Sequence, residues 1–449
     1  MEKEEKQPQK RKGTAVWMII IVLALLLGAA TAWYFLLGPG KPTPVGQREP
    51  QQMQAAPAAE EQHTAPPRTI VPEVHWLPEE KPEEPEEPEA EPEPEQAEPE
   101  PEEPESTSLT LMALGDNLIH WSVYTSAQTA DGYDFTPFYE DIAKIVSQYD
   151  LACINQETIF INDRQEISNY PVFGTPPEVG DALAAAGFDI VTCATNHAYD
   201  KREAGIYDTV TYWREKHPEI TMLGLHDSEA DAQILHVVEK NGIRLALLNY
   251  TYSLNGFVAS QPYFADMLTD KEKILSDLAR AEEEADLTIV FAHWGVEYQF
   301  QPDPSQTQMA QFMADNGADL IIGAHPHVVE PLWTVTAADG RQVPVFYSLG
   351  NFISQQPNMI NHLGAMASVE ITKDETGTYV SGCEILPTVN VILKNPEGPL
   401  NSYRPMLLRD YTQELADLHV LGCMPDWMQM KFDEIVSVPN PNAPAGTNG

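Results

Sequence analysis

His325 and His327 follow an apolar run, within the stretch DLIIGAHPHVVEP at 319–331, and a proline separates them. In an extended segment, side chains two residues apart point the same way, and Pro326 stiffens the backbone by fixing φ. One imidazole at this place would favour a solvated turn. Two imidazoles that point the same way favour a metal site, provided that other segments supply further ligands.

Other segments of the chain that read as strands also end in polar residues. In open α/β sheets, functional groups collect at the carboxyl ends of the strands. Each residue alone has a structural explanation, such as a helix cap, an Asx-turn or a solvated side chain. Together they offer the carboxylates, amide oxygens and imidazoles that a divalent cation binds. The set comprises Asp116, His120, Asn155, Glu157, Asn196, His197, His293 and Asn351.

The absence of cysteine from these strand ends favours a catalytic metal site with open positions over a structural zinc site. Such a site would activate water and hold a phosphoryl or carbonyl oxygen. The chain has 4 cysteines at scattered positions without a C-x-x-C pair. Cys153 and Cys193 lie in apolar runs, so we expect buried free thiols, with disulfides as the alternative for an exported domain.

Alternating apolar runs and amphipathic stretches supply the elements that would position these residues. Helices are predicted at PEVGDALAAAG, EAGIYDTVTYWREKH and SQTQMAQFMADNG, each followed by an apolar strand-like run. Asn241-Gly242 between two apolar runs predicts a β-hairpin. This order predicts an α/β fold with a largely parallel core and additional antiparallel strands.

The domain organisation is predicted from composition. Residues 1–15 include the basic stretch QKRKG, and residues 16–37 are apolar without a charge, about the length that spans a bilayer as a helix. We predict a single-pass anchor in the cell membrane with a cytoplasmic N-terminus, and a cleaved signal peptide at Ala30-Thr31-Ala32 is the alternative. A disordered Pro/Glu-rich linker at 38–106, an extracellular domain at 107–435 and a disordered tail at 436–449 would follow.

The linker at 38–106 contributes −15 of the net charge of −42, from 19 Glu against 4 Lys and Arg, and the acidic charge argues against nucleic acid as a partner.

Six stretches carry a resemblance to a known family: GDNLIH, NQETIF, TNHAYD, HWGVEYQ, GAHPHVVEP and YSLGNFI. In this order, over about 108–395, the chain resembles CapA-type poly-γ-glutamate capsule synthesis proteins, which are similar to the calcineurin-like metallophosphoesterase superfamily. The resemblance implies a four-layer α/β sandwich with a metal centre at one sheet edge.

Carried over by residue, the resemblance implies metal ligands at Asp116, Glu157, Asn196, His293, His325 and His327. It implies that His197 is a general acid or contacts phosphate. Additional candidates are His120, Asn155 and Asn351. The chain departs from the superfamily's usual pattern in three places: Asn117-Leu118 replace the usual x-His after Asp116, Thr195 precedes Asn196, and the bridging position holds Glu157. His120 is the candidate substitute for the missing histidine.

Two functions are consistent with the sequence. The first is an anchored metal-dependent hydrolase with Mn, Fe or Zn, which acts on a phosphoester or an amide of an envelope polymer. The second is a non-catalytic component that binds poly-γ-glutamate during synthesis or export, together with membrane subunits of a capsule synthase. Only the first requires a proton donor, so His197→Ala distinguishes them.

Overall fold

The computed structural model of the protein describes residues 106–395 and 400–442. The predicted membrane span at 16–37 and nearly all of the predicted linker lie outside these residues. Among the residues that are described, no helix is long and apolar enough to cross a membrane.

The first sheet is mixed and contains the strand that carries Asp116. Its central strands β1 to β4 are parallel, whereas β12 and β13 pair antiparallel beside β1. A short strand, β11 (Asn351–Ile353), pairs with the carboxyl end of β1. The strand order is β16 (Met406–Leu407), β13 (Gly377–Val389), β12 (Leu363–Asp374), β1 (Thr107–Asn117), β2 (Leu151–Gln156), β3 (Ile190–Thr192), β4 (Thr221–Leu223).

The second sheet is also mixed, and its strands β6, β7, β8 and β10 are parallel. The predicted hairpin is confirmed: β5 and β6 pair antiparallel, and Asn241 and Gly242 both have the positive φ that the tight turn requires. The strand order is β5 (His236–Lys240), β6 (Ile243–Thr251), β7 (Leu287–His293), β8 (Leu320–Ala324), β10 (Gln342–Leu349), β9 (Val329–Thr336). The α/β class predicted from the sequence is confirmed, with both sheets mixed.

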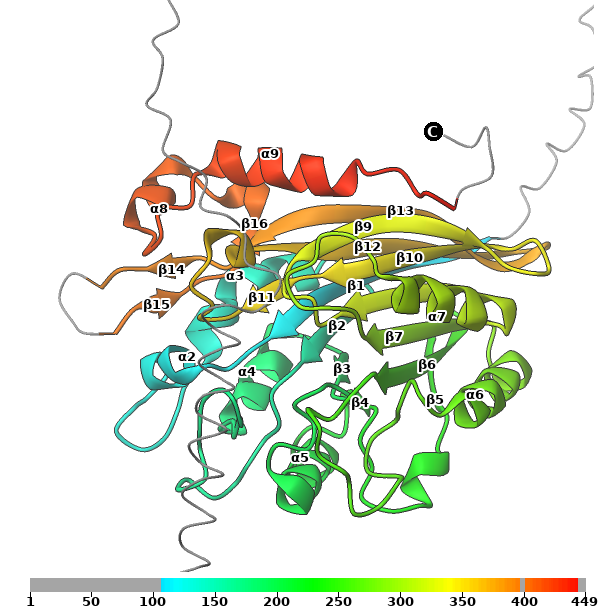
Figure 1. Ribbon diagram of the computed structural model, residues 1–449, viewed down its shortest axis with the longest axis horizontal. Helices are drawn as coiled ribbons and strands as arrows, with labels where there is room; N and C mark the ends of the chain where they lie inside the picture. The colour runs from blue at the N-terminus through cyan, green and yellow to red at the C-terminus, as the bar shows by residue number, and fades with distance from the viewer. Residues whose placement is uncertain (1–105, 396–399, 443–449) are drawn as a thin grey trace, which may run out of the picture. The chain divides into compact units, whose positions relative to one another are not determined.

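The two sheets pack face to face, and helices cover their outer faces (Figure 1). Alternate residues of β1 show the layering, because Leu111 faces the core between the sheets and Met112 faces the helices. Cys153 lies in the core between the sheets, and all the cysteines are free thiols, as predicted. The principal helices are α2 (Trp121–Ser126), α3 (Thr136–Val146), α4 (Glu178–Ala186), α5 (Arg202–Lys216), α6 (Lys271–Glu284), α7 (Pro304–Asp315), α8 (Gln413–Leu418) and α9 (Pro425–Val436).

The C-terminal boundary differs from the prediction of a tail that begins at 436. Helix α9 ends at Val436, and the chain then runs beside β9. The Val438 carbonyl accepts a hydrogen bond from the Trp333 indole at 2.9 Å, and Asn440 donates to the Thr334 carbonyl at 3.0 Å. Residues 437–442 are therefore bonded to the domain, and 443–449 lie outside the described residues.

Candidate metal centre

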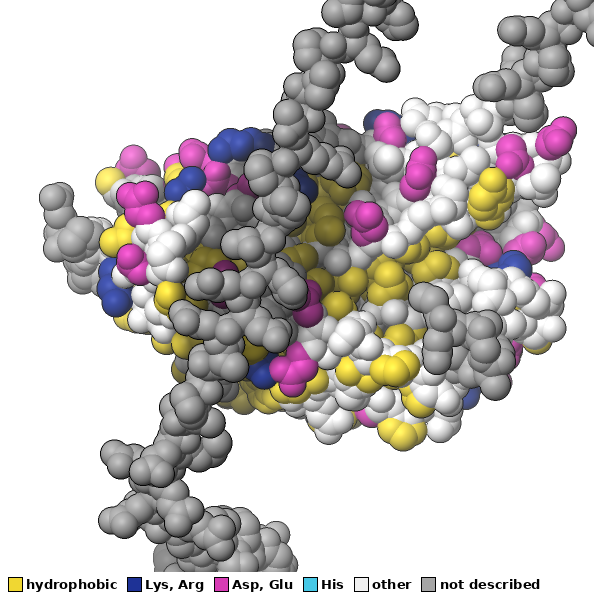
Figure 2. Space-filling model, turned by 90° about the horizontal axis from the view of Figure 1, so that it is seen from above, with side chains coloured by type: hydrophobic (Ala, Val, Ile, Leu, Met, Phe, Trp, Pro, Cys, Tyr) yellow, Lys and Arg dark blue, Asp and Glu magenta, His cyan; other side chains and the backbone are white. Residues whose placement is uncertain are grey.

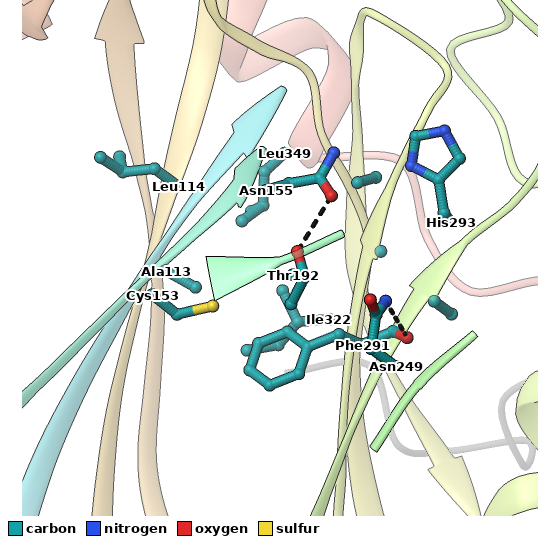
Figure 3. A pocket seen from close by; sticks show the side chains of 13 residues that line it. Ala113, Leu114, Cys153, Asn155, Thr192, Asn249, Phe291, His293, Ile322 and Leu349 are labelled. Atoms are coloured by element: carbon teal, nitrogen blue, oxygen red, sulfur yellow. Dashed lines mark hydrogen bonds between the residues drawn. The ribbon is translucent and has the colours of Figure 1, made fainter. Parts of the chain in front are cut away.

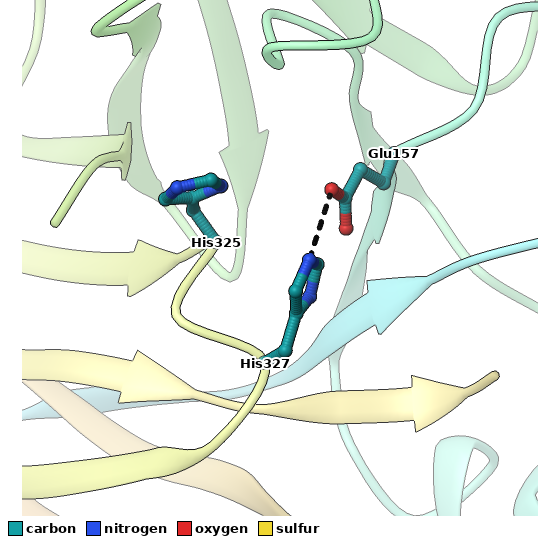
Figure 4. Close-up of side chains that lie close together, drawn as sticks. All are labelled: Glu157, His325 and His327. Carbon is teal, nitrogen blue, oxygen red and sulfur yellow. Dashed lines mark ion pairs between the residues drawn. The ribbon is translucent and has the colours of Figure 1, made fainter. Parts of the chain in front are cut away.

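The predicted ligands meet at one edge of the molecule because the strand ends of both sheets converge there. Glu157 follows β2, His293 ends β7, and His325 follows β8. Ligand atoms of Glu157, His325 and His327 lie within 4.8 Å of one another, and all three side chains are buried (Figure 4). The structure thus brings together a carboxylate and two imidazoles, a ligand set suited to a divalent cation.

The turn that carries the two histidines is not the extended segment that the sequence suggested. His325 has φ of 102° and His327 has φ of 59°, values that side chains with a Cβ rarely adopt. The imidazoles converge because the backbone bends sharply on both sides of Pro326. Strained φ values outside glycine cost about 1–3 kcal/mol each, and they are concentrated at functional sites.

Glu157 occupies the centre of the cluster. Its Oε1 lies 3.8 Å from Nε2 of His293 and 3.8 Å from Nε2 of His327. Neither carboxylate oxygen has a hydrogen-bond partner among the described residues. Burial, with the Asp116 charge as the next cause, raises the pKa of Glu157 well above its ordinary value. A buried carboxylate without donors fits a bound cation, which would supply the missing counter-charge.

The surrounding imidazoles are in the form that binds metals. Burial, and then the neighbouring histidines, lower the pKa of His293 and His325 well below the ordinary value, so both rings are neutral. Among the described residues, Nδ1 of each ring has no hydrogen-bond partner. Neutral imidazoles close to an unpartnered carboxylate make this cluster fit one or more divalent cations.

Asp116 and Asn155 support one side of the cluster. Asp116 accepts from Asn155 Nδ2 at 2.9 Å, and its Oδ2 lies 3.0 Å from Nδ1 of His327. Asn155 in turn accepts from Thr192 at 2.9 Å. Through Asp116, this chain of hydrogen bonds fixes the orientation of the His327 ring.

Asn196 supports the opposite side. Its Oδ1 lies 2.9 Å from Nε2 of His293, a distance at which a hydrogen bond joins them here and at which both atoms could also share one cation. Four of the six predicted ligands therefore form two groups, one with Asp116 and His327 and one with Asn196 and His293, and Glu157 lies between them. The ring of His325 lies 4.9 Å from the His293 ring and 5.7 Å from the His327 ring, measured between centroids.

Two of the additional candidates lie beside the cluster rather than within it. His120 is half-buried near Gln355, whose backbone N–H donates to its Nδ1 at 3.2 Å, and its desolvation lowers its pKa to about 4. Asn351 donates to the Asn361 carbonyl at 3.1 Å and to Gln356 at 3.0 Å. His120 is not among the side chains whose ligand atoms lie within 4.8 Å of one another, and Asn351 Oδ1 has no hydrogen-bond partner among the described residues, so both stay candidate ligands.

His197 is paired with a carboxylate that the sequence analysis did not identify. Its Nδ1 lies 2.7 Å from Oδ2 of Asp200, which also accepts from the Phe173 backbone N–H at 2.7 Å. The ring packs edge-on against Phe173, with centroids 4.7 Å apart. Asp200 fixes the orientation of the imidazole, and the spacing of three residues in TNHAYD was a signal that could have revealed the pair.

Close backbone contacts at the strand ends require glycine. A Cβ on Gly115 would lie 1.9 Å from the Gly350 carbonyl oxygen, and the Asp116 N–H donates to that same oxygen at 2.8 Å. Glycine at 115 therefore allows Gly350, and with it β11, to lie against the end of β1.

The cluster is closed on its inner side and open on one outer side. A cavity of only about 10 Å³ lies between the sheets, with Asn155 and His293 on its wall (Figure 3). That volume holds about one water molecule. A larger pocket of about 310 Å³ has His120, His197 and His327 on its wall. A substrate would therefore approach through this larger pocket.

Residues 110–356, more than half of the chain, match the family described as "Bacterial capsule synthesis protein PGA_cap". A segment of 206 residues is 32% identical to the PGA biosynthesis protein CapA of Bacillus subtilis and covers 46% of this chain and 53% of that protein. The Capsule biosynthesis protein CapA of Bacillus anthracis is 32% identical over 184 residues, 40% of this chain and 43% of that protein. The chain thus spans about half the length of these relatives.

Two solved structures show weaker likeness. The Haemophilus influenzae NAD nucleotidase (NadN) aligns at 12% identity and a TM-score of 0.42, over 73% of this chain and 60% of that chain. The calcineurin-like phosphoesterase YfkN of Bacillus subtilis aligns at 16% identity and a TM-score of 0.38, over 67% of this chain and 94% of that chain. At TM-scores this low, neither likeness supports a conclusion about this chain.

Proposed function

The chain belongs to the PGA_cap family of bacterial capsule synthesis proteins, and on that basis we propose that it acts in the synthesis or export of poly-γ-glutamate or a related envelope polymer. We propose further that it does so through a divalent-metal centre with hydrolase activity. The observation that carries this proposal is the buried, unpartnered carboxylate of Glu157, 3.8 Å from two imidazoles. The sandwich would then be of the metallophosphoesterase type.

In this proposal, each residue at the site has a definite task. Glu157, His293, His325 and His327, with Asp116 and Asn196, would hold the cation. The bound cation would supply Lewis-acid chemistry toward a phosphoester or amide oxygen and toward water. His197, oriented by Asp200, would deliver a proton to the leaving group.

The test is polymer cleavage and phosphodiester cleavage by the full chain, loaded with Mn, Fe or Zn in turn. His197→Ala is expected to lower the rate of both by about 10²–10⁴-fold, the usual contribution of a general acid. His217→Ala is the matched control, because His217 also pairs with carboxylates but lies at the surface end of α5. Wild-type rates in His197→Ala would refute the assignment.

The alternative is a non-catalytic component that binds the polymer. It is favoured by the wall of the outer pocket, where tyrosine and amide side chains lie beside the cluster. In that case His197→Ala would leave polymer production in cells unchanged, whereas loss of polymer production would support the enzyme.

We also propose a membrane location, with residues 16–37 as the anchor and the domain outside the cell. The support is the uncharged apolar run that follows the basic stretch QKRKG. Protease added to intact cells should remove the domain. A protected domain would contradict this topology.

A further inference from the structure

The pocket that opens onto the cluster carries little charge. Asn169, Tyr170, Tyr298, Gln355 and Gln356 contribute to its wall, and Glu297 is its carboxylate. Among the described residues that line it, there is neither Lys nor Arg. On the face of the molecule in Figure 2, Lys and Arg likewise occur in small separate groups among Asp and Glu. Apart from Glu297 and the histidines, a ligand in the pocket would therefore meet uncharged groups.

Two side-chain amides in this wall have a fixed orientation. Asn169 Oδ1 accepts from the Trp121 backbone N–H at 2.9 Å, and Gln355 Oε1 accepts from the Ser122 backbone N–H at 3.0 Å. A backbone N–H can only donate, so the atom that faces it must be the amide oxygen. The NH₂ group of each amide is consequently left over, and neither bonds to another described residue.

Tyrosine rings flank these donors. Tyr170 is 67% exposed and Tyr298 is 48% exposed. Tyr298 has φ of 67°, and its backbone N–H donates to the Pro326 carbonyl at 2.8 Å. The Tyr298 ring lies 6.0 Å from the His327 ring, measured between centroids. An exposed ring held in a strained conformation beside the cluster suits contact with a ligand.

We propose that Asn169 and Gln355 bind carbonyl oxygens of an amide-linked polymer and thereby select a polyamide over a phosphoester. This inference rests on the proposed function, since it assumes a polymer substrate at this cluster. Two neutral donors and flanking rings match an amide backbone. Recognition of a phosphate commonly uses the bidentate charge of Arg, which this wall does not provide.

The test uses the double variant Asn169→Asp with Gln355→Glu in the full chain. Each new carboxylate can still accept a hydrogen bond from the backbone N–H on α2 that the amide oxygen bonded. Its second oxygen is an acceptor, however, and it replaces the NH₂ donor of the amide. Gln233→Glu, at an exposed position in the short 3-10 helix before β5, controls for the effect of one added carboxylate. Binding of a poly-γ-glutamate oligomer is measured by calorimetry at 1 M salt, where the Debye length is about 3 Å and charge repulsion is screened.

The double variant should bind the oligomer about 10-fold or more weakly, as expected for two lost hydrogen bonds. Its metal content and its cleavage of bis(p-nitrophenyl) phosphate should match the wild type, because that small phosphodiester does not need the amides. Equal oligomer affinity in wild type and variant would overturn this inference alone. If the double variant lost phosphodiester cleavage as well as oligomer binding, the claim that the two amides select a polyamide over a phosphoester would be overturned. A wild type that does not bind the oligomer would overturn the proposed function itself.

Discussion

Two buried glutamates in this protein, Glu157 and Glu330, have different surroundings. Both are less than 2% exposed, and burial is the first cause that raises the pKa of each. Glu157 has two imidazoles at 3.8 Å and no hydrogen-bond donor among the described residues. Glu330 on β9 accepts from Gln306 at 2.6 Å, and its pKa is raised to about 8. Burial beside an amide donor leaves Glu330 an acid that keeps its proton, whereas we propose that burial beside two imidazoles makes Glu157 a ligand for a cation.

The largest expected effect is the loss of metal from Glu157→Gln. The Gln amide keeps the shape of the Glu157 side chain but lacks the negative charge that a divalent cation needs. Metal content should therefore fall from nearly one ion per chain to less than about 0.1 ion per chain. Elemental analysis of the full chain measures this, and Glu330→Gln is the matched control that should keep its metal. Equal loss in both variants would mean that the two glutamates do not differ as proposed.

The next effect concerns the stability of Glu330→Gln as a function of pH. Because the folded protein raises the pKa of Glu330 from 4.5 to about 8, the folded state holds more protons between these values. The contribution of Glu330 to stability therefore falls as pH rises from about 4.5 through 8. The variant should match the wild type near pH 5 and exceed it by about 4 kcal/mol at pH 9, since each unit of pKa shift is worth about 1.4 kcal/mol.

Urea unfolding of metal-free protein at both pH values gives this difference directly. A variant that is less stable than the wild type at pH 9 would show that Glu330 is ionised in the folded protein and paired with a donor.

The smallest expected effect is that of Gln306→Leu. Gln306 completes a capping box with Asp303 at the start of α7 and donates to Glu330. Its loss should cost about 1–2 kcal/mol at pH 5, because it removes one cap and leaves Glu330 without its donor. Metal content should stay at the wild-type value, and a change in metal content would show that the two glutamate sites are coupled.

Much of the fold could be predicted from the sequence, because local patterns specify local structure. The helix at PEVGDALAAAG and the hairpin at Asn241-Gly242 follow from capping, periodicity and a turn that needs positive φ. The boundary at 435 was less accurate, since the hydrogen bonds of Val438 and Asn440 to β9 join residues about 100 positions apart.

Residue types and their spacing specify which chemical groups stand at the strand ends: carboxylates, amides and imidazoles at positions that the sheets would bring together. How these groups meet depends on the folded chain. The positive φ at His325 and His327, the pairing of His197 with Asp200, and the orientation of the Asn169 and Gln355 amides are examples. The physical reason is that distances, hydrogen bonds and burial arise between residues far apart in the chain, whereas residue type and local spacing do not depend on the fold.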